Sequence, residues 1–247
     1  FFLINSFYLL FNVLSLVGLF RYQRKTSYVR MKEIFSLPLA KPISIIAPAY
    51  NEGPNILESV RSLLALEYPL FEVIVVNDGS TDGTSDRVRR AARRDARIRL
   101  RRLARNRGQA AALNAGLALA RGRYLALLDA DDVAAPDRLE RQLTAFEADP
   151  ELVLVGGAVV PWCPRHGAEG PPWRYARDDD AIRARSLFRS EFISGAMTVD
   201  LERARRHRLR FDEARRLGAD WAFPIEAMRV GRVANVADVV MRYRIHP

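Results

Sequence analysis

Three aspartates, Asp129, Asp131 and Asp132, directly follow a short apolar run at Tyr124–Leu128. Crowded carboxylates raise one another's pKa values, and a divalent cation relieves their repulsion. Mg²⁺ or Mn²⁺ in such a site takes one or two carboxylates and completes its coordination with phosphate oxygens and water. An acidic N-cap for the helix predicted from Pro136 is the alternative, but one carboxylate would supply it. The pattern therefore favours a metal site that also binds a diphosphate.

Two other polar clusters also follow predicted strands. Ala49–Glu52 comes after the apolar run Ile43–Ala47, and Asn77–Ser80 comes after Phe71–Val76. Ligands of open parallel sheets bind beyond the carboxyl ends of the strands, so we expect all three clusters to meet at one edge. There Asp78 would accept hydrogen bonds from a base edge, although turn chemistry alone also explains this cluster.

Three weaker signals lie elsewhere in the chain. Arg105–Gly108 precedes a predicted helix, and both helix N-termini and arginine favour phosphate, although a solvated turn is the alternative. Asp220, beside Trp221, is either a general base for a hydroxyl or a helix cap. His246 is a lone histidine, which is usually structural but can ligate a metal.

The elements that must position these residues alternate between strands and helices. This alternation predicts an α/β fold with a mainly parallel sheet flanked by helices. The predicted helices of the first half begin at Pro54, Asp82, Gly108 and Pro136, and proline suits a first helical turn. The less regular second half predicts a strand at Leu152–Val160, a loop at Trp162–Arg177, a helix at Asp178–Arg189, a helix that follows Gly218–Trp221 and reaches about Val230, and a strand at Val233–Val240.

Composition limits the classes of protein and of partner. The chain has 247 residues, of which 49% are hydrophobic, and a net charge of +10. Its single cysteine, Cys163, excludes a disulfide within the chain. The charge predicts anionic partners such as nucleic acid, acidic lipid or phosphorylated substrates. We expect no nucleic-acid partner, because no basic helix with interleaved aromatic residues appears.

The segment 1–20 carries no charged residue and is followed at once by Arg21, Arg24 and Lys25. Twenty helical residues span about 30 Å, the thickness of the hydrocarbon core, and basic residues past the end favour the cytoplasmic side. We therefore expect a transmembrane helix at 1–20, a basic linker at 21–41 along the inner leaflet, and a cytoplasmic domain at 42–247. A buried soluble helix and a signal peptide are the alternatives. The chain does not begin with Met, so we expect a fragment of a longer membrane protein.

Four motifs in this order resemble family 2 glycosyltransferases of the GT-A fold. They are Pro48–Glu52, Val76–Asp82, Asn106–Gly108 with Ala112, Asn114 and Gly116, and Asp129–Asp132. The resemblance covers Lys41–Pro247. It implies an inverting, metal-dependent enzyme that transfers a sugar from a nucleotide-diphosphate donor, usually a UDP-sugar, to the hydroxyl of a saccharide or lipid-linked acceptor. The preceding apolar segment resembles that of bacterial polysaccharide synthases, but their Q-x-x-R-W motif is absent from the sequence.

The resemblance also implies a role for individual residues. It places in the nucleotide pocket Ala49, Tyr50, Glu52, Asp78, Arg107 and Asp129. Asp131 and His246 would hold Mg²⁺ or Mn²⁺, and Trp221 would contact the acceptor. Asp220 matches the catalytic base of a Glu-Asp motif, except that Ala219 replaces the glutamate.

Two other functions stay open at this point. A polyprenyl-phosphate sugar synthase of the same fold would need no base, because its acceptor is a phosphate. A catalytically inactive nucleotide-sugar-binding module is favoured if Ala219 marks a decayed site. Metal-dependent release of UDP separates an enzyme from the inactive module.

Overall fold

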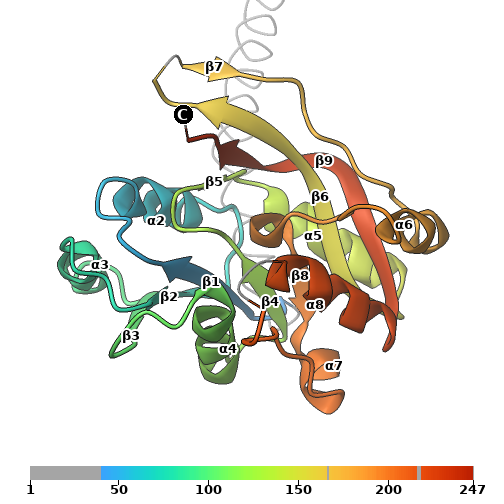
Figure 1. Ribbon diagram of the computed structural model, residues 1–247, viewed down its shortest axis with the longest axis horizontal. Coiled ribbons are helices and arrows are strands. Elements are labelled where there is room, and N and C mark those ends of the chain that lie inside the picture. Colours follow the sequence, from blue (N-terminus) through green and yellow to red (C-terminus); the bar gives the residue numbers. More distant parts are fainter. Residues whose placement is uncertain (1–39, 166, 216–217, 247) are drawn as a thin grey trace, which may run out of the picture. The chain divides into compact units, whose positions relative to one another are not determined.

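The computed structural model describes residues 40–165, 167–215 and 218–246 (Figure 1). Its described strands form one mixed sheet in the order β3-β2-β1-β4-β8-β6-β9-β5, with β7 paired to β6. The first four in that order are parallel neighbours: β1 (Ile43–Ala49), β2 (Phe71–Asn77), β3 (Ile98–Arg102) and β4 (Tyr124–Leu127). Their carboxyl ends therefore lie at the same edge of the sheet.

Helices cover both faces of this parallel half because alternate side chains of a strand point to opposite faces. Every residue of β1 is buried. Ile43 and Ile45 pack in one core cluster with α2 (Ile56–Leu64) and Val88 of α3 (Thr84–Ala92). Ile46 packs in the other cluster with α4 (Gln109–Leu119).

The other half of the sheet is mixed rather than parallel. β8 (Thr198–Asp200) runs antiparallel to both β4 and β6 (Leu152–Cys163), whereas β6 runs parallel to β9 (Arg232–Arg244). Two short strands, β5 (Val133–Ala134) and β7 (Ala168–Glu169), run antiparallel to β9 and β6. The prediction of a mainly parallel sheet therefore describes the first half of the chain and is incomplete for the second.

The remaining helices lie near their predicted positions, with one addition. They are α5 (Arg138–Ala148), α6 (Asp179–Ser186), α7 (Leu201–Arg206), α8 (Ala219–Met228) and the 3₁₀ turn η1 (Ser194–Ala196). The sequence did not predict α7, which is only six residues long and is capped by the Asp200 side chain. The predicted loop at 162–177 contains the end of β6, all of β7 and a bridge between Trp173 and Val159.

The predicted membrane helix at 1–20 lies outside the residues that the structure describes. Within the described ranges, none of the helices has both the length and the apolar character that crossing a bilayer requires.

Candidate active site

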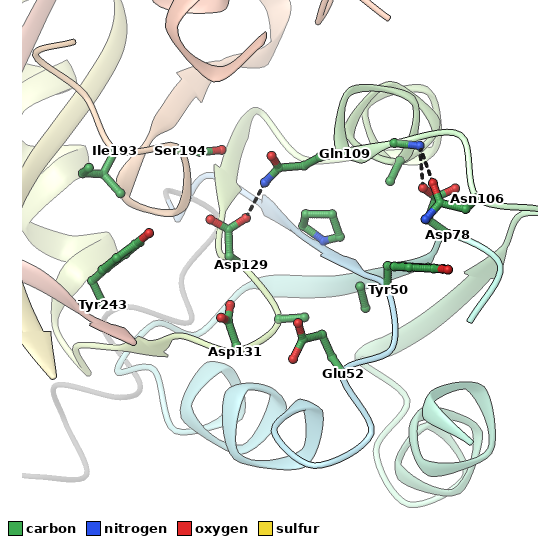
Figure 2. Close-up of a pocket in the computed structure, with 15 residues that line it drawn as sticks. Tyr50, Glu52, Asp78, Asn106, Gln109, Asp129, Asp131, Ile193, Ser194 and Tyr243 are labelled. Atoms are coloured by element: carbon green, nitrogen blue, oxygen red, sulfur yellow. Dashed lines mark hydrogen bonds between the residues drawn. The ribbon is translucent and has the colours of Figure 1, made fainter. Parts of the chain in front are cut away.

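A pocket of about 450 Å³ lies at the carboxyl ends of β1, β2 and β4 (Figure 2). It gathers residues from all three predicted polar clusters, together with the start of α4, η1 and the end of β9. Its polar and aromatic lining includes Tyr50, Glu52, Asp78, Gln109, Asp129, Asp131, Ser194 and Tyr243, and Ala49 contributes apolar surface. The expectation that these clusters share one edge is therefore confirmed by the arrangement of the strands.

Asp78 lies at one end of the pocket beside Tyr50 (Figure 2). Its buried carboxylate accepts hydrogen bonds from the backbone N–H of Arg107, at 2.9 and 3.1 Å, and of Gly108, at 2.7 Å. Gly79 makes this close approach possible, because a Cβ there would lie 2.6 Å from the carbonyl carbon of Arg105. Asp78 thus fixes the loop before α4 against the end of β2.

The side chain of Arg107 has a partner outside the pocket lining. Its Nη2 donates to Oε2 of Glu213 at 2.8 Å, and both side chains are at least 40% exposed. Arg107 is not among the residues that line the pocket, although its neighbours Asn106 and Gly108 are. Arg107 therefore contributes to the pocket through its backbone N–H, which donates a hydrogen bond to Asp78. The sequence did not indicate this contact.

The aspartates after β4 occupy the middle of the pocket and have different partners. Oδ1 of Asp129 accepts a hydrogen bond from Nε2 of Gln109 at 2.9 Å. Oδ2 of Asp131 lies 2.6 Å from Nε2 of His246. Burial raises the pKa of the nearby Glu52, and the negative charge of Asp131 raises it further. This part of the pocket therefore favours a cation.

Asp132 is buried and does not line the pocket. Its Oδ1 accepts a hydrogen bond from the backbone N–H of Arg244 at 2.7 Å, whereas its buried Oδ2 has no hydrogen-bond partner among the residues that the structure describes. Burial raises the pKa of the Asp132 carboxyl to about 8, and the charges of Asp129 and Asp131 contribute. The third aspartate thus anchors the end of β9 to the turn after β4.

Arg244 extends this anchor through its side chain. Its Nε donates to the backbone oxygen of Asp131 at 2.6 Å, and its Nη2 donates to Glu58 of α2 at 2.6 Å. The guanidinium carbon also lies 4.5 Å from the ring centroid of Trp162. These contacts fix the segment that ends at His246, two residues later.

The donor atoms at Asp131 and His246 fit a divalent cation. A carboxylate oxygen and an imidazole nitrogen are both ligands for Mn²⁺, and Mg²⁺ commonly binds one or two carboxylates plus substrate phosphates. Within the described ranges, no group of three or more His, Cys, Asp or Glu side chains could hold a metal. A cation held by these two side chains alone would have coordination positions left for other ligands.

Asp220 and Trp221 lie in the first turn of α8. Trp221 is 38% exposed and is not among the lining residues, and the position of the Asp220 side chain is outside what the structure describes. Helix α8 is nevertheless linked to α4, whose start lines the pocket. The Asn114 amide of α4 pairs with the backbone N–H and C=O of Phe211, whose ring stacks on Phe223 of α8 at 4.1 Å.

The sequence alone did not single out several lining residues. Gln109, Ile193 and Ser194 carry no distinctive motif, although the small-residue segment after Ile193 marks a tight turn. Tyr243 precedes Arg244 in a segment that the resemblance had marked only for its histidine. The only sequence signal for these residues was thus that some of them lie next to a recognised motif.

The model of glycosyl transferase family 2 matches residues 44–233, which include the strands and helices that form the pocket except the first residue of β1 and most of β9. The chain belongs to glycosyl transferase family 2. As a family 2 glycosyltransferase, it is 36% identical over 202 residues to the succinoglycan biosynthesis protein ExoO of Rhizobium meliloti. That match covers 76% of this chain and 56% of ExoO, so the chain spans little more than half of that relative.

Two solved structures share the GT-A fold of this family 2 enzyme. TarS 1-349 of S. aureus in complex with UDP-GlcNAc has a TM-score of 0.69 at 22% identity, covering 83% of this chain and 59% of that one. The mannosyltransferase PcManGT of Pyrobaculum calidifontis, in complex with GDP-Man and Mn²⁺, has a TM-score of 0.64 at 26% identity, covering 93% and 67%. The nucleotide-sugar dependence of the family agrees with a pocket that combines Asp78 with a cation-favouring centre.

Proposed function

We propose that this family 2 glycosyltransferase transfers a sugar from a UDP-sugar to the hydroxyl of a saccharide or lipid-linked acceptor, with inversion at the anomeric carbon. One observation carries the proposal. A single pocket holds Asp78 and Tyr50 at one end, Asp131 in the middle and Tyr243 at the other end (Figure 2). This order matches the base, diphosphate and sugar of a nucleotide sugar. His246 does not line the pocket, but its Nε2 lies 2.6 Å from Oδ2 of Asp131.

The uridine would bind at the end formed by Tyr50 and Asp78. Tyr50 is 48% exposed, so its ring is available to stack on a base. Asp78 is already fixed by three contacts to backbone N–H groups, and a carboxylate oxygen can accept more than one hydrogen bond. Its remaining lone pairs would accept the N–H of the base. Ala49, Glu52 and Asp129 would complete the nucleotide pocket.

Asp131 and His246 would hold Mn²⁺ or Mg²⁺. When bound, the cation supplies positive charge that stabilises the departing diphosphate. The structural neighbour in complex with GDP-Man and Mn²⁺ supports this choice of metal. Gln109 keeps the Asp129 carboxylate oriented beside this centre through its 2.9 Å hydrogen bond.

Asp220 would act as the general base that removes the proton from the acceptor hydroxyl. It lies in the first turn of α8, and the Asn114–Phe211 pairing fixes the chain leading into this helix. The hydroxyl oxygen then attacks the anomeric carbon from the side opposite the diphosphate. The absent glutamate, replaced by Ala219, leaves proton transfer to one carboxylate. Trp221, next in the helix, would contact the acceptor.

We also propose that the segment 1–20 anchors the enzyme to the membrane and that the catalytic domain lies on the cytoplasmic side. The support is its uncharged, apolar sequence and the basic residues that follow it. Cell fractionation followed by protease protection of the catalytic domain tests this placement. Release of the full chain by high salt alone would contradict it.

Incubating the protein with a panel of nucleotide sugars, with and without Mn²⁺, tests the transferase activity. We expect release of UDP from at least one UDP-sugar only when metal is present. Equal release with EDTA would contradict metal dependence. Tight UDP-sugar binding with no release from any donor would instead identify a nucleotide-sugar-binding module.

A further inference from the structure

Two aromatic residues contact each other at the end of the pocket away from Tyr50 and Asp78. Tyr243 of β9 lines the pocket, and Figure 2 shows it on the opposite side of Asp129 and Asp131 from Tyr50. The ring of Trp173 lies 5.5 Å from the ring of Tyr243, centroid to centroid, at an angle of 44°. Trp173 does not itself line the pocket, but it packs against the aromatic residue that lines this end.

The position of Trp173 is fixed although its ring is accessible. Its backbone N–H donates to the carbonyl of Val159 at 2.8 Å, and its carbonyl accepts from the N–H of Val159 at 3.1 Å. The residue thus forms a bridge to β6 while 39% of its surface stays exposed. An indole that is held by the backbone but is not buried in a core is suited to binding a ligand at little cost in conformational entropy.

We propose that Trp173 and Tyr243 form an acceptor subsite that binds the face of a pyranose ring, so that the acceptor is a saccharide. The inference rests on the proposed glycosyl transfer and names its acceptor. The C–H groups on one face of a pyranose carry partial positive charge and are weakly hydrated. They match the negative face of an aromatic ring, whereas the sugar hydroxyls stay in water.

The charged groups at this end favour a saccharide over a lipid phosphate. A phosphate acceptor would need cationic side chains directed at it. Instead, Arg174 donates to the carbonyl of Ala237 at 2.7 Å, and Arg242 forms an ion pair with Glu169 at 2.8 Å. Arg244 is 93% buried by its contacts with the loop after β4 and with α2. These three arginines are thus engaged with protein acceptors.

The test uses the full chain and separates donor from acceptor. UDP release from the best donor without acceptor, and the Kd for UDP, report the donor side. Transfer to a panel of methyl and aryl pyranosides, as mono- and disaccharides, and to a short polyprenyl phosphate reports the acceptor side. The variants are Trp173→Ala, Trp173→Leu, which keeps apolar bulk, and Trp173→Phe, which keeps an aromatic face. Phe188→Ala is the matched control, since Phe188 is an aromatic residue that is 84% exposed and follows α6, whereas Trp173 packs against Tyr243.

We expect Trp173→Ala and Trp173→Leu to raise the KM for the pyranoside acceptor about 10-fold, and Trp173→Phe to restore most of the loss. The Kd for UDP and acceptor-free UDP release should stay within about 2-fold in all variants, which also shows that each is folded. An unchanged acceptor KM in Trp173→Ala, or transfer to polyprenyl phosphate but to no pyranoside, would overturn the inference. Absence of UDP release from every donor would overturn the glycosyl transfer itself, a result distinguishable from both.

Discussion

Nε2 of His246 lies 2.6 Å from Oδ2 of Asp131, although the two residues are 115 positions apart in the chain. The contact brings the end of β9 to the turn after β4. It depends on the hydrogen bonds of Arg244 to that same turn. The contact joins the aspartate cluster, which gave the strongest prediction of a metal site, to a lone histidine for which the prediction was weak.

If this pair holds the metal, His246→Ala should weaken Mn²⁺ binding about 10-fold or more, because one protein ligand is lost. Titrating Mn²⁺ in the presence of saturating UDP, with free Mn²⁺ followed by electron paramagnetic resonance, measures the change. His207→Ala is a matched control, since His207 is also an exposed histidine but lies at the end of α7, whereas His246 contacts Asp131. Equal Mn²⁺ affinity in both variants would remove His246 from the metal site.

Asp78→Asn should raise the Kd for UDP about 10-fold or more. The amide replaces one accepting oxygen with an N–H₂ donor that faces the backbone N–H groups of Arg107 and Gly108. Losing charge-assisted hydrogen bonds of this kind costs about 1.5–3 kcal/mol each. Isothermal titration calorimetry with UDP checks the prediction, and unaltered affinity would show that Asp78 neither contacts the base nor shapes the loop around it.

Arg107→Ala separates two roles for this residue. The guanidinium forms an exposed ion pair with Glu213, and such pairs contribute about 0–1 kcal/mol. We therefore expect the Kd for UDP to change less than about 5-fold. A loss as large as that of Asp78→Asn would mean that the guanidinium leaves Glu213 and binds the diphosphate, as the family resemblance implies.

Asp132 should make the stability of the metal-free protein depend on pH. Its native pKa of about 8 lies above the ordinary value of 3.8, so the native state retains a proton that the unfolded chain loses. The stabilisation is complete below pH 3.8 and is lost as pH rises through about 8, with a slope of at most about 1.4 kcal/mol per pH unit. Urea denaturation in EDTA from pH 5 to 8.5 measures this slope. Asp132→Asn, which is neutral throughout, should have a flatter profile, and equal slopes would contradict the assignment.

Asp220→Asn should reduce transfer by about 10² to 10⁴-fold and leave UDP binding unchanged, because only proton removal from the acceptor is lost. Steady-state transfer to the accepted sugar and calorimetry with UDP measure the two effects. Undiminished turnover would exclude Asp220 as the base and would favour an acceptor that needs no deprotonation, such as a lipid phosphate.

The sequence predicted the parallel half of the fold closely. The apolar runs that became β1, β2 and β4 are bounded by proline, glycine and polar clusters, which are local signals. It missed β5, β7 and β8 because strands of two or three residues are too short to show a periodicity. The hydrogen bonds of β5 and β8 come from neighbouring strands that are distant in sequence.

For the site, too, the sequence predicted local features but not contacts between distant segments. The polar residues at three strand ends were predicted to converge, because parallel strands place their carboxyl ends together whatever their register. The partners of those residues were not predicted. Asp132 became a buried anchor and not a pocket residue, and Arg107 bonded to Glu213, because each outcome depends on which segment packs against the turn.

By itself, then, the sequence determined the order of strands and helices in the first half of the chain, the family, and which acidic groups lie at the edge of the sheet. Apolar periodicity and turn chemistry involve residues that are close in the sequence, so both can be recognised from the sequence alone. Only the tertiary structure decided that His246 meets Asp131 and that Trp173 meets Tyr243. Such contacts depend on the pairing and register of β6 and β9, which the packing of the whole domain sets.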